Sequence, residues 1–203
     1  MDLSLYKPTE TEEWISFIYQ KHGICYAADM DIDHIAAIFR AMVELHPHES
    51  KVIWSSNFAL IYLHALLSKE QQRENFFHEL GHIVRHCGDQ YGMPETFIEL
   101  QEQQAAQFQL YAAMPAFMLH EFIHDVYSWG AFEKVLAEAF CLPIRFVQKR
   151  LNQILNRLCL AQIDKERRDR TVDTSYITTD YIRQKQAEMG RQRLIREKSW
   201  GIL

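Results

Sequence analysis

The sequence predicts a mostly helical α+β domain with a small antiparallel sheet. Most of the chain consists of segments whose apolar residues recur at helical spacing and whose ends carry capping residues, Gly or Pro. Short β-like runs that suggest a hairpin occur over residues 52–63. With 203 residues, of which 48% are hydrophobic, the chain can bury a substantial core as one domain with an appendage.

The first third of the chain is expected to form two helices and the sheet. Helical apolar spacing predicts a helix over Pro8–His22 and a second one over Asp31–Val43. Val52–Ser55 and Ala59–Leu63 predict an antiparallel hairpin. A further strand is expected from one of two segments, Gly23–Ala27 or Val43–His46.

The middle of the chain has stronger helix signals. Ser68 followed by Gln71 forms a capping box, which predicts a helix that continues through His86. Pro94 suits the first turn of the next helix, and Pro115 ends it. Later helices are expected over three ranges, Pro115 to about Tyr127, Ala131–Phe140 and Pro143–Leu158. We therefore predict a domain over residues 1–160 that includes a C-terminal helix pair, followed by a charged, helical or partly disordered tail over 161–203.

Two segments match the pattern H-E-x-x-H, namely HELGH at 78–82 and HEFIH at 120–124. Histidines four residues apart on a helix lie one turn apart, so both imidazoles can reach one zinc ion. The glutamate between them lies beside the metal and can act as general base. An amphipathic helix with a solvated polar face gives the same pattern, so neither copy alone establishes a metal site.

A catalytic zinc also needs a third protein ligand. Glu99 and Glu102 lie on one stripe of the helix after HELGH, and in an antiparallel helix pair Glu102 is approximately level with His82. The same helix offers small residues that allow close approach, Ala105, Ala106, Ala112 and Ala113. After HEFIH the available carboxylates are Glu133 and Glu138, without such a setting. The residues favour the first motif and leave the second possible.

The first motif belongs to a longer pattern. HELGH, then Glu102-Gln-Gln-Ala-Ala-Gln-Phe108, then Ala113-Met114-Pro115, resembles the ImmA/IrrE family of zinc metallopeptidases, and most closely the anti-repressor proteases of integrative elements and phages. The resemblance covers about residues 58–118. It implies a zincin-like metallopeptidase domain in which His78, His82 and Glu102 bind zinc and Glu79 is the catalytic base.

The resemblance also bears on neighbouring residues. It places no metal at HEFIH, which is then a polar helix face. Glu99 remains an alternative ligand or a partner for a histidine's free N–H. His86 is either a surface residue or a residue that orients the substrate. Gln109 and Ala106 depart from the family pattern, where alanine and a polar residue are usual, and these departures bear on helix packing.

The resemblance implies a function as well. We expect a zinc-dependent endopeptidase that cleaves a helix-turn-helix repressor and thereby derepresses genes of a mobile element. The alternative is a non-catalytic regulatory module that binds DNA or a repressor, since residues 136–151 look like a helix-turn-helix. Candidates for stabilising the oxyanion are Tyr91, Tyr111, His120 and His124.

Composition limits the location and partners. The N-terminus lacks a signal-peptide pattern, and the longest apolar stretch, residues 58–67, is too short to span a membrane. The four cysteines are widely spaced, so reduced thiols in the cytoplasm are expected. The net charge is −5, and residues 162–203 hold ten Lys/Arg against seven Asp/Glu, which leaves −8 on the rest. This acidic body makes nucleic acid an unlikely partner.

Overall fold

The computed structural model describes residues 2–54, 58–86, 93–122, 128–170 and 178–199, except for the side chains of residues 54, 190 and 193–199. The chain divides into two units, Met1–Ala161 and Gln162–Leu203. The elements of the first unit are α1 (Glu10–Lys21), the 3-10 helix η1 (Ala27–Asp29), α2 (Ile32–Ile38), β1 (Ala41–His46), β2 (Lys51–Trp54), β3 (Ala59–His64), α3 (Lys69–Arg85), α4 (Glu95–Ala113), the 3-10 helix η2 (Ala116–Phe122), α5 (Trp129–Ala139) and the first part of α6 (Ile144–Arg170). The predicted mostly helical α+β class is confirmed.

The sheet is mixed, so the prediction of a purely antiparallel sheet was wrong. The strand order is β1-β3-β2. The predicted hairpin is confirmed, because β2 pairs antiparallel with β3. However, β1 pairs parallel with β3. The chain reverses direction after β1 and again after β2, so β1 and β3 run the same way and can pair only in parallel.

One expectation for the segment before the sheet was wrong, and one was confirmed in its second alternative. The second helix ends at Ile38 instead of Val43, because Arg40 adopts a left-handed backbone conformation with φ 55° and redirects the chain into β1. Of the two segments considered for a further strand, Val43–His46 is confirmed as part of β1, and residues 24–27 do not form a strand. The Asp29 carboxylate accepts hydrogen bonds from the backbone N–H groups of Cys25 and Tyr26, at 2.9 and 2.8 Å, which holds a tight turn there.

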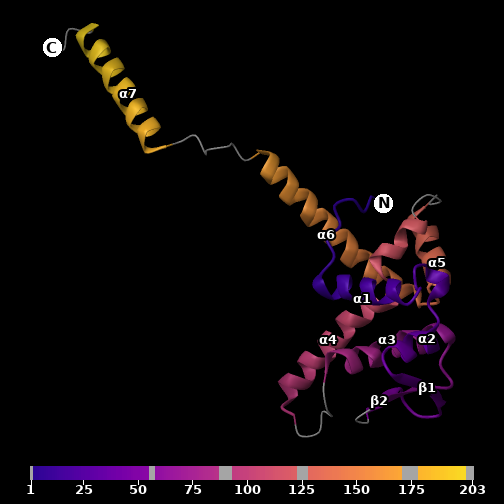
Figure 1. Cartoon of the computed structure of the whole chain (residues 1–203). Helices are drawn as coiled ribbons and strands as arrows, with labels where there is room; N and C mark the ends of the chain where they lie inside the picture. Colours follow the sequence, from indigo (N-terminus) through magenta and orange to yellow (C-terminus); the bar gives the residue numbers. More distant parts are fainter. Residues whose placement is uncertain (1, 55–57, 87–92, 123–127, 171–177, 200–203) are drawn as a thin grey trace. The chain divides into compact units, whose positions relative to one another are not determined.

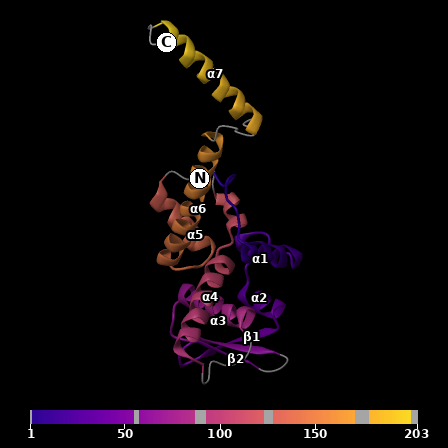
Figure 2. The same cartoon turned by 90° about the vertical axis from the view of Figure 1, so that its left-hand side faces the viewer.

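Helix α3 is central to the first unit. It contacts the sheet through β2 and β3, and it contacts α4 along much of its length (Figure 1). The view in Figure 2 shows the sheet as a separate layer beside α3. The apolar residues Phe76, Phe77 and Leu80 of α3 are fully buried. The helix that carries HELGH is therefore fixed on one side by strands and on another by α4.

A buried ionic network joins α1 to α6. Arg150 is 0% exposed and Glu12 is 4% exposed, and Arg150 Nη2 lies 2.6 Å from Glu12 Oε1. Arg157 and the Tyr6 hydroxyl also donate hydrogen bonds to the Glu12 carboxylate. Burial alone would raise the pKa of Glu12, but the charge of Arg150 and the hydrogen bonds lower it to about 2. Because the carboxylate is paired on both oxygens, this charge is stable inside the unit.

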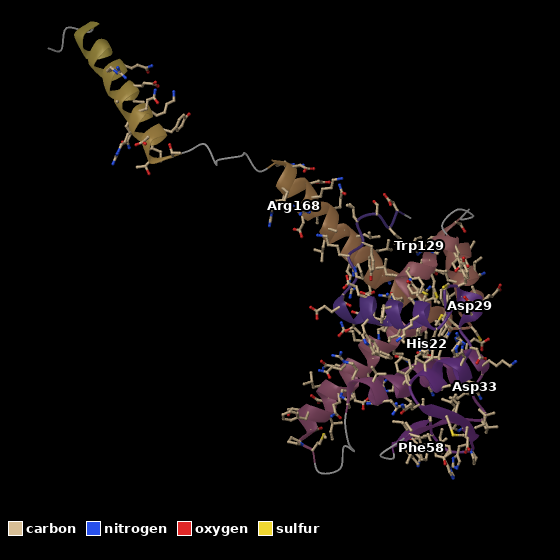
Figure 3. The ribbon with its side chains drawn as sticks, viewed as in Figure 1. His22, Asp29, Asp33, Phe58, Trp129 and Arg168 are labelled. Carbon is tan, nitrogen blue, oxygen red and sulfur yellow. The ribbon has the colours of Figure 1, made fainter. Side chains whose placement is uncertain are left out.

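The last elements agree partly with expectation. The predicted helix pair is present as α5 and α6, and Cys141 in the turn between them has φ 50°. Helix α6 continues to Arg170, well beyond the predicted end at Leu158. The second unit contains the end of α6 and α7 (Thr179–Ser199). Arg168 projects from the end of α6 in Figure 3, and the described side chains of α7 are mostly exposed. Among the described residues, no helix combines the length and apolar character needed to cross a membrane.

Candidate metal centre

The HELGH segment lies inside regular helix. The predicted capping box is confirmed, because Ser68 Oγ accepts from the Gln71 N–H at 3.3 Å and Gln71 Oε1 accepts from the Ser68 N–H at 3.1 Å. The helix then runs without a break to Arg85. His78 and His82 are therefore one turn apart, and their Nε2 atoms lie 3.2 Å from each other. The start of α3 thus fixes where the two imidazoles meet.

Gly81 allows α4 to approach the histidines. A Cβ atom at Gly81 would lie 2.9 Å from the carbonyl oxygen and 3.0 Å from the Cα of Ala105, closer than side chains tolerate. The expected close approach at Ala105 is confirmed, and Ala105 is fully buried. Sequence reasoning identified the alanine and missed the glycine. The backbone contact brings Glu102, one turn before Ala105 on α4, to the two histidines.

The ligand atoms of three residues converge as a result. Glu102 Oε2 lies 3.1 Å from His78 Nε2, and Glu102 Oε1 lies 3.4 Å from His82 Nε2. Donors at 2.0–2.1 Å from a tetrahedral zinc ion are roughly 3.3–3.4 Å apart. The distances between the two imidazole nitrogens and from each of them to one oxygen of Glu102 are close to that value, so the three side chains fit one zinc ion. Among the residues that the structure describes, this is the only such group of three His, Cys, Asp or Glu side chains.

The cluster is closed on the protein side and open on the other. The side chain of His82 is 7% exposed, that of His78 is 27% exposed, and that of Glu102 is 45% exposed. Burial lowers the pKa of His82, and the charge of the Glu102 carboxylate partly offsets this shift. The neutral imidazole that burial favours is the form that binds metal. An ion held here would have protein on one side and room for water or substrate on the other.

Glu79 lies in the same cleft and outside the group of three. Burial raises its pKa to about 7, and the nearby Glu102 carboxylate adds to the shift. The cleft has a volume of about 330 Å³ and is lined by Ser50, Lys51, Val52, His78, Glu79, His82 and Glu102. One wall is thus the start of the edge strand β2, and the other belongs to α3 and α4. A carboxylate beside the three donors, facing open space, is well placed for proton transfer.

Two contacts that sequence reasoning missed hold the wall of the cleft at the start of β2 in place. The Ser50 hydroxyl accepts hydrogen bonds from Asn75 Nδ2 at 3.0 Å and from the His64 backbone N–H at 3.1 Å. Asn75 precedes His78 by one helical turn, so the wall of the cleft at the start of β2 is linked to α3. The departure at Gln109 also has a structural role, because its Nε2 donates to the Glu74 carbonyl at 2.7 Å and links α4 to α3.

The other residues considered lie elsewhere. Glu99 is exposed and outside the group of three. His86 Nε2 lies 3.1 Å from the Gln101 carbonyl oxygen, so it contacts α4. Tyr111 and His120 line a different cavity. Tyr91 and His124 lie outside the described residues. Of the oxyanion candidates, the two that the structure describes, Tyr111 and His120, therefore lie outside the cleft.

The described part of HEFIH, residues 120–122, does not lie in the α-helix that was predicted for it. Residues 116–122 form the 3-10 helix η2, where an α-helix from Pro115 was predicted. A 3-10 helix has three residues per turn, so residues four apart do not share a face. His120 Nδ1 lies 2.5 Å from the carbonyl oxygen of Phe117, which satisfies that ring locally. The remainder of the motif falls outside the described residues.

Comparison with known proteins bears on this arrangement. Residues 33–152, more than half of the chain and including the whole cluster, match the IrrE N-terminal-like domain. The chain belongs to the ImmA/IrrE family. Two relatives of this ImmA/IrrE chain come from Bacillus subtilis (strain 168). The phage-like element PBSX protein XkdA is 30% identical over 155 residues, covering 76% of this chain and 77% of XkdA. The uncharacterized protein YqaB is 28% identical over 153 residues, covering 75% of this chain and 88% of YqaB.

The Gly81 contact gives a testable expectation for this ImmA/IrrE domain. Gly81→Ala should lower the free energy of unfolding by about 1–3 kcal/mol, because the added methyl forces α3 and α4 apart. It should also weaken metal binding, since α4 carries Glu102. Denaturant unfolding and metal titration measure the two effects. Gly130→Ala is the control, because a Cβ there meets nothing within 4 Å. Equal behaviour of the two variants would contradict the role of the contact.

Proposed function

We propose that this chain is a zinc-dependent endopeptidase in which His78, His82 and Glu102 hold the metal. The observation that carries the proposal is the convergence of donor atoms from three residues, at separations of 3.1–3.4 Å, beside a cleft. Two imidazole nitrogens and one carboxylate form the donor set of zinc peptidases that use a glutamate as third ligand. Membership of the ImmA/IrrE family supports the same assignment.

Each residue of the cleft then has a chemical role. Zinc bound at the three donors would polarise the scissile carbonyl and make a water molecule more acidic. Glu79 takes the proton of the attacking water and passes it to the nitrogen of the leaving amine. The edge strand β2 offers backbone groups to an extended substrate segment, which would add as a further strand. The Asn75–Ser50 hydrogen bond holds the start of that strand against α3.

The proposed substrate is a helix-turn-helix repressor of a mobile element, cleaved in the cytoplasm. The relative XkdA is named as a protein of a phage-like element, which supports this setting. An acidic body of −8 would attract a basic DNA-binding domain and so raise the rate of encounter. Co-expression with the regulator encoded beside the gene tests the proposal. The regulator should become shorter and its promoter more active. Derepression by an inactive variant would point instead to a regulatory module that binds without cleaving.

Metal content distinguishes the two motifs. His78→Ala should lose most of the bound zinc because only two donors remain, whereas His120→Ala should keep it. Glu102→Ala should weaken zinc binding, with Glu99→Ala as the matched control on the same helix. Elemental analysis after dialysis against zinc measures all four variants. Zinc loss from Glu99→Ala with full retention in Glu102→Ala would move the third ligand to Glu99.

A further inference from the structure

The edge strand β2 would determine how a bound peptide is oriented on the protein. It pairs with β3 on one side only, because the strand order is β1-β3-β2. Val52 and Glu79 line the same metal cleft, and the backbone N–H of Val52 lies on the side of the Glu79 carboxylate, at the open edge. In an antiparallel ladder the N–H and C=O of one residue point to the same side. A peptide that adds at this edge therefore bonds through Val52 and takes the place of the Glu79 carboxylate at the Val52 N–H.

Side chains on β2 alternate between the two faces of the sheet. Val52 pairs with the fully buried Ile61 and packs on the core. The side chains of Lys51 and Ile53 must then lie on the opposite, outer face. Lys51 pairs with Tyr62 and Ile53 pairs with Leu60, in the register of β2 with β3. Lys51 and Ile53 thus belong to two adjacent rows of cross-strand side chains, which run across the outer face of the sheet.

These rows differ in chemistry and both end at the open edge. The first row is apolar and continues from Met42 through Leu60 to Ile53, with Met42 60% and Ile53 46% exposed. The second row ends at Lys51, whose side chain is exposed. Within the described part of the chain, Lys51 has no carboxylate at ion-pair distance. A strand that extends the sheet would continue the first row with an apolar side chain and the second with an acidic one.

We infer that the preferred substrate segment has the pattern apolar–x–acidic and binds antiparallel to β2. The apolar residue lies beside Ile53, the acidic residue beside Lys51, and the middle residue opposite Val52 at the metal cleft. The antiparallel direction places the apolar residue first in the peptide, because β2 runs from Lys51 to Ile53. This inference rests on the proposed peptidase function and adds to it the sequence class of the substrate.

Cleavage of a randomised synthetic peptide library by the zinc-loaded full chain tests the inference. Cleaved peptides should be enriched in apolar–x–acidic over apolar–x–basic segments by roughly two- to fivefold, the range expected for one cross-strand pair. Lys51→Glu should reverse the preference, so that the acidic-to-basic ratio changes by roughly four- to twenty-fivefold in total. Lys21→Glu on α1 makes the same change of net charge outside the cleft and should keep the wild-type preference. Zinc content of each variant shows that the metal centre is intact.

The outcomes separate the inference from the proposed function. Cleavage without the apolar–x–acidic enrichment, or with the reversed order acidic–x–apolar preferred, overturns the inference and leaves the peptidase function standing. An unchanged preference in Lys51→Glu also overturns it. If the zinc-loaded wild type cleaves the library no faster than Glu79→Gln does, the proposed function fails and the inference fails with it.

Discussion

Glu79→Gln is expected to keep one zinc per chain and to lose peptidase activity by about 10²–10⁴-fold, the usual effect of removing a general base. Glutamine has nearly the same size and leaves the three donors untouched, because Glu79 is outside the group formed by His78, His82 and Glu102. An amide oxygen is far less basic than a carboxylate and cannot take the proton of the attacking water. Single-turnover cleavage of the proposed repressor substrate, together with zinc analysis, measures both quantities.

The matched control for this experiment is Glu99→Gln, which removes the same charge from an exposed position on α4. It should retain both zinc and activity. Loss of zinc from Glu79→Gln would mean that Glu79 is a ligand. Retention of both zinc and activity would mean that another group transfers the proton.

Glu12→Gln is expected to lower the free energy of unfolding by about 3–5 kcal/mol, the cost of leaving a buried charge without its partner. Arg150 is fully buried, and its Nη2 donates to Glu12 at 2.6 Å. The neutral amide cannot balance that charge. Glu13→Gln is the control, since Glu13 is the exposed neighbour on the same helix. It should change stability by no more than about 0.5 kcal/mol.

The pH dependence of stability tests the same network. The pKa of Glu12 is about 2 in the folded chain, below the ordinary value of 4.5, so folding favours the ionised form. Its contribution is complete above about pH 4.5 and is lost as the pH falls towards about 2. Wild-type stability should therefore fall across this range. The difference between wild type and Glu12→Gln should shrink over the same range, and a constant difference would contradict the role of the Glu12 charge.

How much of the site could be predicted depended on whether the signals were local. The Ser68–Gln71 capping box and Pro94 fixed the starts of α3 and α4, and helical spacing then placed Glu102 near His82. Gly81 was missed because its reason is a contact with Ala105 on another helix. Ser50 and Asn75 were missed for the same reason, since their hydrogen bond joins residues 25 positions apart. Such pairs leave no periodic trace in the sequence.

The errors in the fold have similar causes. The end of α2 depends on the left-handed conformation of Arg40, a position where glycine or asparagine would have been the usual signal. The parallel pairing of β1 with β3 depends on which edge of the hairpin β1 joins, and strand composition does not encode that choice. HEFIH shows the opposite case. Its spacing fits an α-helix, and its described residues, 120–122, instead lie in a 3-10 helix that follows Pro115.

The ion pair between Glu12 and Arg150 has a consequence for how the chain is made. Its two partners are 138 positions apart. At translation rates of roughly 5–20 residues per second, Glu12 is synthesised roughly 7–28 s before its partner on α6. During this interval the nascent N-terminal segment lacks the guanidinium that neutralises its inward-facing carboxylate. Cooperative closure of the domain is therefore expected only at the end of synthesis, and chains released before Arg150 should be degraded faster than the full-length protein.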